Sequence, residues 1–167
     1  MKRRLAITLL VMSGLVLFVF AADKAMDIYN GTLEERVNAM AKIQPGLGTV
    51  MIEYGNRFTN TYYAAKGGNW GMAQYQLKEA TEIQEVGEVT RPKNAPMLRS
   101  FEHGYLDTLK TDIKNKDWTS FQKHYDAAVA GCNACHVATG HPYVEFQLPL
   151  APAMNYVNLN KKTDPAK

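Results

Sequence analysis

Residues 118–136 have the sequence WTSFQKHYDAAVAGCNACH, and this stretch decides the fold. Its apolar side chains recur at steps of three and four, the spacing that places side chains on one face of an α-helix. Asp117 comes directly before the stretch and is a favourable N-cap residue. The predicted buried stripe consists of Trp118, Phe121, Tyr125, Ala128, Cys132 and Cys135.

Three earlier segments have the same periodicity. The first runs from Gly46 to Lys66. The second has Asn69 as its expected N-cap and ends near Gly87 and before Pro92, and the third starts near Asn94. Four helices of about 20 residues with short connections predict an all-α fold, an antiparallel four-helix bundle. The stripe residues are Leu47, Val50, Met51, Tyr54, Phe58, Tyr62 and Ala65; then Trp70, Ala73, Leu77, Ala80 and Ile83; then Met97, Leu98, Phe101, Tyr105, Leu109 and Ile113.

Two further segments flank the predicted bundle, which we place at residues 46–140. Residues 23–45 form a linker and a short helix, because Thr32 and Glu35 have the spacing of a capping box. Residues 141–167 form an irregular C-terminal extension that is rich in proline. The extension is expected to pack over the edge of the functional site or against the helices.

The N-terminus resembles an export signal. Lys2, Arg3 and Arg4 precede an uncharged run at residues 5–22. Cleavage after Ala21 is compatible with a secretory signal peptide, whereas the length of the run also suits an uncleaved membrane anchor. Both interpretations place the rest of the chain in the periplasm, either free or at the periplasmic face of the inner membrane.

The net charge of +3 belongs to this N-terminal segment. The chain has 19 basic and 16 acidic side chains, and Lys2, Arg3 and Arg4 account for the whole excess. The remainder is close to neutral and gives no reason to expect a nucleic-acid partner.

One pentapeptide carries the chemistry. Cys132-Asn133-Ala134-Cys135-His136 has the C-x-x-C-H pattern of c-type haem attachment, and it contains both cysteines of the chain. Two thiols at this spacing can form thioethers with the two vinyl groups at one edge of a porphyrin. The adjacent imidazole can then serve as the proximal axial ligand of the iron. The motif predicts one covalent haem c held by Cys132, Cys135 and His136.

Three other interpretations of these residues compete with haem. A disulfide or a chance match is improbable in an exported protein whose only two cysteines both lie in the motif. A thioredoxin-type redox pair normally lies between a strand and a helix, a setting that this sequence lacks. A structural zinc site could recruit Cys132, Cys135, His136 and His141, but zinc ligand pairs usually come from two separate loops. Haem is therefore the favoured cofactor.

With the motif at the end of the fourth predicted helix, the chain resembles the class II c-type cytochromes, the cytochrome c′ family. The resemblance covers about residues 46–140 and implies a mono-haem four-helix bundle. It also implies that the residue at the sixth coordination position decides the function, and Met51 matches that position best. The sequence departs from the family after His136, where Val137 to Lys167 is longer than the usual short basic tail.

Other candidates for the sixth position are weaker. Methionine is a common core residue, and the chain has eight, among them Met72, Met97 and Met154. His141 starts on the proximal side of the motif. His103 and His124 fall on predicted helices, where structural or exposed roles are more common.

These observations leave two main functions open. With Met51 as sixth ligand, the protein is an electron carrier between redox partner proteins and not an enzyme. With an open sixth position, it is a gas-binding protein for nitric oxide or carbon monoxide. An accessory haem subunit of a larger complex is a third alternative, and related bundles are often homodimers.

Overall fold

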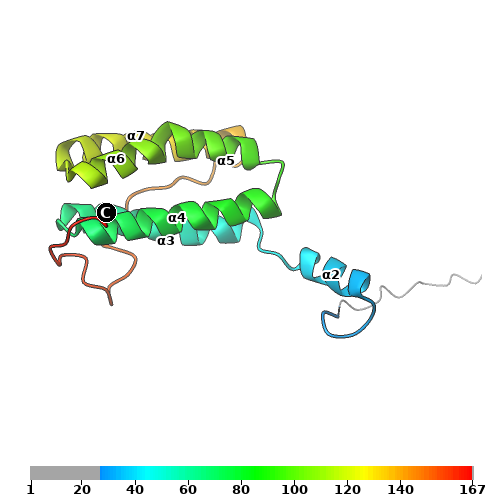
Figure 1. The fold of residues 1–167 in the computed structure, drawn as a ribbon. Coiled ribbons are helices and arrows are strands. Elements are labelled where there is room, and N and C mark those ends of the chain that lie inside the picture. The colour runs from blue at the N-terminus through cyan, green and yellow to red at the C-terminus, as the bar shows by residue number, and fades with distance from the viewer. Residues whose placement is uncertain (1–26, 167) are drawn as a thin grey trace, which may run out of the picture. The chain divides into compact units, whose positions relative to one another are not determined.

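The computed structural model describes residues 27–166, so the predicted signal or anchor at residues 1–22 lies outside the described residues. Over this range the fold is all-α, as the sequence predicts (Figure 1). None of the helices in this range combines the length and the hydropathy that a membrane span requires. The chain separates after Ile43 into two compact units.

The first unit contains helix α2, Leu33–Lys42. The backbone N–H of Glu35 donates to the Thr32 hydroxyl at 3.2 Å, and the Thr32 N–H donates to the Glu35 carboxylate at 2.8 Å. The predicted capping box is therefore confirmed.

The second unit begins with two long helices, α3 (Leu47–Lys66) and α4 (Trp70–Thr90), that lie side by side (Figure 1). Asn69 caps α4 as predicted, since its side chain accepts from the Met72 N–H at 3.2 Å. Helix α4 ends at Thr90, three residues after Gly87 and before Pro92, which agrees with the predicted end. Gly87 lies where α3 approaches closely, because an added Cβ would be 3.0 Å from the Leu47 side chain.

The third predicted helix consists of three parts. Helix α5 (Ala95–Phe101) leads into the π-helical turn η1 (Glu102–Leu106), which continues as α6 (Asp107–Asn115). In the π turn the Asp107 N–H donates to the Glu102 carbonyl, five positions earlier. The wider turn shifts the register of the apolar stripe, and Leu106, which the regular stripe omits, is fully buried.

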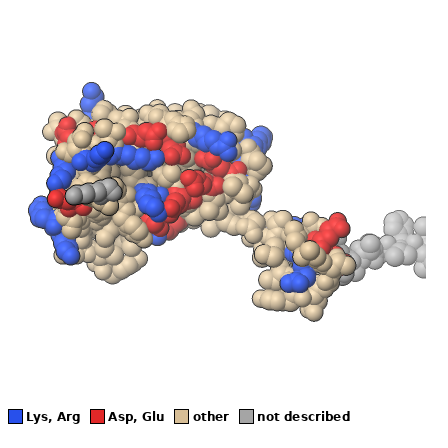
Figure 2. Space-filling model, in the orientation of Figure 1, with Lys and Arg blue, Asp and Glu red and all other residues tan. Residues whose placement is uncertain are grey.

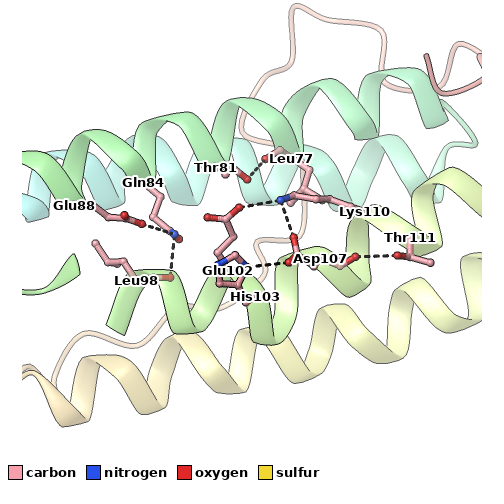
Figure 3. A network of polar contacts seen from close by, with 10 residues as sticks. All are labelled: Leu77, Thr81, Gln84, Glu88, Leu98, Glu102, His103, Asp107, Lys110 and Thr111. Carbon is pink, nitrogen blue, oxygen red and sulfur yellow. Dashed lines mark hydrogen bonds and ion pairs between the residues drawn. The ribbon is translucent and has the colours of Figure 1, made fainter. Parts of the chain in front are cut away.

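Polar contacts brace this wide turn (Figure 3). The Lys110 ammonium contacts Glu102 at 3.0 Å and Asp107 at 2.9 Å. The buried Gln84 of α4 donates to the Leu98 carbonyl at 3.1 Å. The exposed side of α4 is mostly acidic, and Lys78 pairs there with Glu79 and Glu82. Side chains of both charges are present on the face of the molecule that Figure 2 shows.

Helix α7, Trp118–Ala138, completes the helical part of the second unit. Asp117 caps it as predicted, accepting from the Ser120 N–H at 3.0 Å. The stripe residues Phe121 and Tyr125 are completely buried. The ring of Tyr125 stacks on Phe58 of α3 with 4.3 Å between ring centroids.

The C-terminal extension lies against the helices along much of its length. Tyr63 donates to the Pro149 carbonyl at 2.6 Å, and the Met154 N–H donates to Asn60 at 3.1 Å. Further along, the Trp70 N–H donates to the Thr163 carbonyl at 3.0 Å. The extension thus belongs to the same compact unit as the helices α3 to α7.

Gly71 allows the end of the extension to dock, which gives the first prediction. A Cβ at Gly71 would lie 2.5 Å from the Asp164 carbonyl oxygen, so Gly71→Ala must displace backbone. We expect this variant to lower the free energy of unfolding by about 1–2 kcal/mol in urea titrations. In Gly48→Ala the new Cβ meets nothing within 4 Å, and this control should be unchanged or more stable by up to about 1 kcal/mol. Equal stability of the two variants would show that the extension does not dock there.

Candidate functional site

A cavity of about 710 Å³ lies between α3, α5 and α7 and is closed on one side by the extension. This volume is within the range of small-molecule and cofactor sites. Its lining is mostly apolar. The residues used below are Met51, Tyr54, Phe58, Met97, Phe101, Cys132, Cys135, His136, His141, Val144 and Phe146.

Both cysteines of the motif line this cavity. They lie three positions apart on α7, so their side chains share one face of the helix. Both are free thiols. Burial, with a smaller effect of Cys135, raises the pKa of the Cys132 thiol to about 12, and burial raises the pKa of Cys135 as well. The two side chains are therefore neutral thiols at neutral pH.

His136 is oriented by the extension. Its Nδ1 lies 2.8 Å from the Val144 carbonyl oxygen. A carbonyl can only accept, so Nδ1 carries the proton and donates. In the neutral ring this leaves the lone pair on Nε2, the nitrogen available to ligate a metal.

The methionines separate into two groups. Met51 of α3 and Met97 of α5 line the cavity, and the Met97 sulfur accepts from the Cys135 thiol at 3.2 Å. The sulfurs of Met72 and Met154 are elsewhere, since both accept from Nε2 of the buried Gln76, at 3.5 and 3.8 Å. The structure thus brings Met51 to the same cavity as the motif, together with Met97.

Of the remaining histidines, only His141 lines the cavity within the described residues. His103 is exposed and contacts Asp107 at 3.1 Å, and His124 contacts Asp112 at 2.7 Å. Both are engaged in local pairs away from the cavity.

Tyr54 is a feature that the sequence pattern does not distinguish from other core aromatics. Its side chain is only 6% exposed, yet its hydroxyl has no hydrogen-bond partner. Phe58 stacks on the ring at 5.7 Å and Phe101 meets it edge-on at 6.4 Å. Burial, and next the neighbouring Cys132, raises the pKa of this hydroxyl well above its ordinary value. This hydroxyl, in the lining of the cavity, is available as a donor to a molecule bound there.

The residues of the cavity fit a covalently attached haem. The site has two thiols on one wall that form no disulfide, an imidazole whose Nε2 lone pair is available, and an apolar lining for a porphyrin. The orphaned hydroxyl of Tyr54 adds a donor for a polar group of the cofactor or of its ligand.

The competing sites are not favoured by the geometry. In residues 27–166, no three side chains of His, Cys, Asp or Glu converge in a way that could hold a metal ion. A zinc site of Cys132, Cys135, His136 and His141 is therefore not assembled. A thioredoxin-like setting is also missing from this range, which has one isolated β-bridge and no longer strand.

Comparison with known proteins gives no relative: no protein-family model, no curated protein and no solved structure matches the chain. The function is therefore inferred from the sequence motif and the site geometry.

The unpartnered hydroxyl of Tyr54 gives the second prediction. In the haem-free protein, Tyr54→Phe should leave the free energy of unfolding unchanged or raise it by up to about 2 kcal/mol, because an unsatisfied buried donor is removed. Tyr125→Phe is the matched control, since it loses a hydrogen bond to the Phe58 carbonyl at 3.1 Å, and should cost about 1 kcal/mol. Equal losses in urea titrations of both variants would show that the Tyr54 hydroxyl has a partner.

The buried thiol of Cys132 gives the third prediction. Its pKa is raised in the folded state, so folding keeps the thiol protonated while the unfolded chain ionises first. This contribution is fully present below about pH 9 and is lost as the pH rises towards the folded-state pKa of about 12. We expect haem-free wild type to lose up to about 4 kcal/mol more than Cys132→Ala over this range, measured by denaturation at each pH. Parallel pH profiles would contradict the buried state of this thiol.

Proposed function

We propose that the protein is a mono-haem c-type cytochrome that carries single electrons between redox partner proteins. One observation carries the proposal: both thiols of C-x-x-C-H and the oriented imidazole of His136 belong to the lining of one cavity of suitable size. The motif alone predicts haem attachment, and the cavity supports it with the necessary space.

Each residue has a defined role in this proposal. Cys132 and Cys135 hold the porphyrin edge as thioethers, and His136 Nε2 is the proximal ligand. When bound, the haem supplies an iron that accepts and releases one electron at a time. The apolar wall formed by Phe58 and Phe101 limits access of water, which helps to set the reduction potential.

Met51 is the proposed sixth ligand. It enters the cavity from α3, on another wall from the α7 motif. A thioether ligand raises the potential and fills the position that a gas would otherwise take. An electron carrier is therefore preferred to a nitric oxide or carbon monoxide binder.

The helices α3, α4, α5–α6 and α7 are proposed to form the antiparallel four-helix bundle of the class II cytochromes. The contacts of α3 with α4, of α6 with α4 and α7, and of α7 with α3 support this arrangement. The predicted export signal or anchor supports a periplasmic location, where haem is attached to such motifs. The partner proteins and a homodimer remain part of the proposal.

The fourth prediction tests the cofactor and the sixth ligand together. The full chain, exported by a host with haem-attachment machinery, should carry one covalent haem by mass and by its pyridine haemochrome spectrum. The ferric protein should be low-spin with a sulfur-to-iron absorption band. Met51→Ala should lose this band and become high-spin. Met72→Ala, a control outside the cavity lining, should keep it.

Two results would contradict this function. A five-coordinate wild type that binds carbon monoxide stoichiometrically would favour the gas-binding alternative. A protein that receives no haem under these conditions would overturn the assignment of the cofactor.

A further inference from the structure

We infer that Asn133 is a positioning residue for His136. Asn133 follows Cys132 directly in the C-x-x-C-H motif. It acts by fixing residues 144–146 of the extension against α7. The inference rests on the proposed function for its consequence at the iron, but the contacts themselves belong to the haem-free chain. The C-x-x-C-H motif places no chemical requirement on this residue, so its role must come from its surroundings.

The Asn133 side chain makes two hydrogen bonds with one residue of the extension. Its Nδ2 donates to the Phe146 carbonyl at 3.1 Å, and its Oδ1 accepts from the Phe146 N–H at 2.8 Å. The amide thus pairs with both backbone groups of Phe146, as a neighbouring strand would. Because both ends of the amide are used, the contact fixes the position and the direction of the chain.

Phe146 is itself held on its other side. Its ring packs 5.9 Å from that of Phe58 on α3, and it lies over Gly55, where an added Cβ would be 3.7 Å from the Phe146 ring. The residue therefore lies between α3 and α7. With the backbone paired to Asn133 and the ring against α3, this point of the extension is anchored at the cavity wall.

Val144 is two residues before this anchor, and its carbonyl is the acceptor for His136 Nδ1 at 2.8 Å. In an extended chain, carbonyl groups two positions apart point to the same side. On α7, Asn133 and His136 are three positions apart and share a face. The two contacts therefore form a matched pair: Asn133 holds Phe146, and His136 meets Val144.

The turn after α7 brings residues 141–144 back towards the helix. Gly140 has a positive φ of 82°, and the His141 N–H donates to the His136 carbonyl at 2.8 Å, which ends the helix. The Val144 N–H then donates to the His141 carbonyl at 2.9 Å. These bonds reverse the chain, while the bonds of Asn133 secure it on α7.

The consequence is a fixed tautomer and orientation of the ligand. An Nδ1–H that donates to a carbonyl strengthens Nε2 as a donor to the metal and stabilises the oxidised iron. If Asn133 is removed, we expect residues 144–146 to separate from α7 and the His136 ring to lose its acceptor.

The fifth prediction tests this coupling first without haem. In the full haem-free chain, ¹⁵N NMR of the His136 ring should show Nδ1–H as the main tautomer in wild type. In Asn133→Ala this preference should be lost. Tyr63→Phe removes a different contact of the extension, with Pro149, and should keep the wild-type tautomer.

The haem-loaded protein gives a second readout. Asn133→Ala should retain covalent haem, since both cysteines are intact, and should show a lower iron–histidine stretching frequency in the ferrous five-coordinate form made by adding Met51→Ala. In the Met51-containing protein, the ratio of ferrous to ferric iron at a fixed potential should rise about tenfold or less. Asn133→Gln keeps both functional groups of the amide and should recover part of each effect.

The outcomes separate the inference from the proposed function. An Asn133→Ala variant that folds and keeps the wild-type tautomer and stretching frequency overturns the inference, while the cytochrome assignment stands. A wild type without haem overturns the assignment, and the tautomer experiment still decides the role of Asn133. If Asn133→Ala fails to fold, Asn133→Leu replaces it, because it fills a similar volume and removes both bonds to Phe146. An unchanged His136 tautomer in that variant then contradicts the inference.

Discussion

The contact between Phe58 of α3 and Tyr125 of α7 is the interaction on which the rest of the second unit depends. The two rings are completely buried and stack at 4.3 Å with an angle of 12° between their planes. The Tyr125 hydroxyl also donates to the Phe58 carbonyl at 3.1 Å. The pair buries the apolar surface of both rings, and the tyrosine hydroxyl has a hydrogen-bond partner. The contact sets the separation of α3 and α7, the helices that supply Met51 and the C-x-x-C-H motif.

Towards the C-terminal end of α7, past the stack, the helical side chains no longer fill the space between the helices. Phe121 and Ala128 of α7 are completely buried, but Cys132 and Cys135, one and two turns further along, are only partly covered. The cavity begins at this point, and residues 141–146 form part of its wall. Side chains of α7 are buried near its middle and line the cavity near its C-terminal end. This change in burial accounts for the position of the site at the end of α7.

The sequence was informative where structure depends on neighbours along the chain. The caps Asn69 and Asp117 satisfy backbone groups within three residues, and the apolar stripes depend on a fixed helical period. The same local reasoning failed at the π turn of residues 102–106, because the burial of Leu106 depends on the added width of that turn. It also could not single out Tyr54 or Asn133. Tyr54 matters because its buried hydroxyl has no partner, and Asn133 matters because it bonds to Phe146, 13 residues later.

The contacts of the extension have a consequence for the order in which the molecule is completed. The bonds between Tyr63 and Pro149 and between Asn60 and Met154 join residues 86 and 94 positions apart. Closing such long loops costs more conformational entropy than closing the loop of a helical hairpin, so we expect these contacts to form after the helices have packed. The C-terminal part of the extension is then the last piece of the second unit to dock.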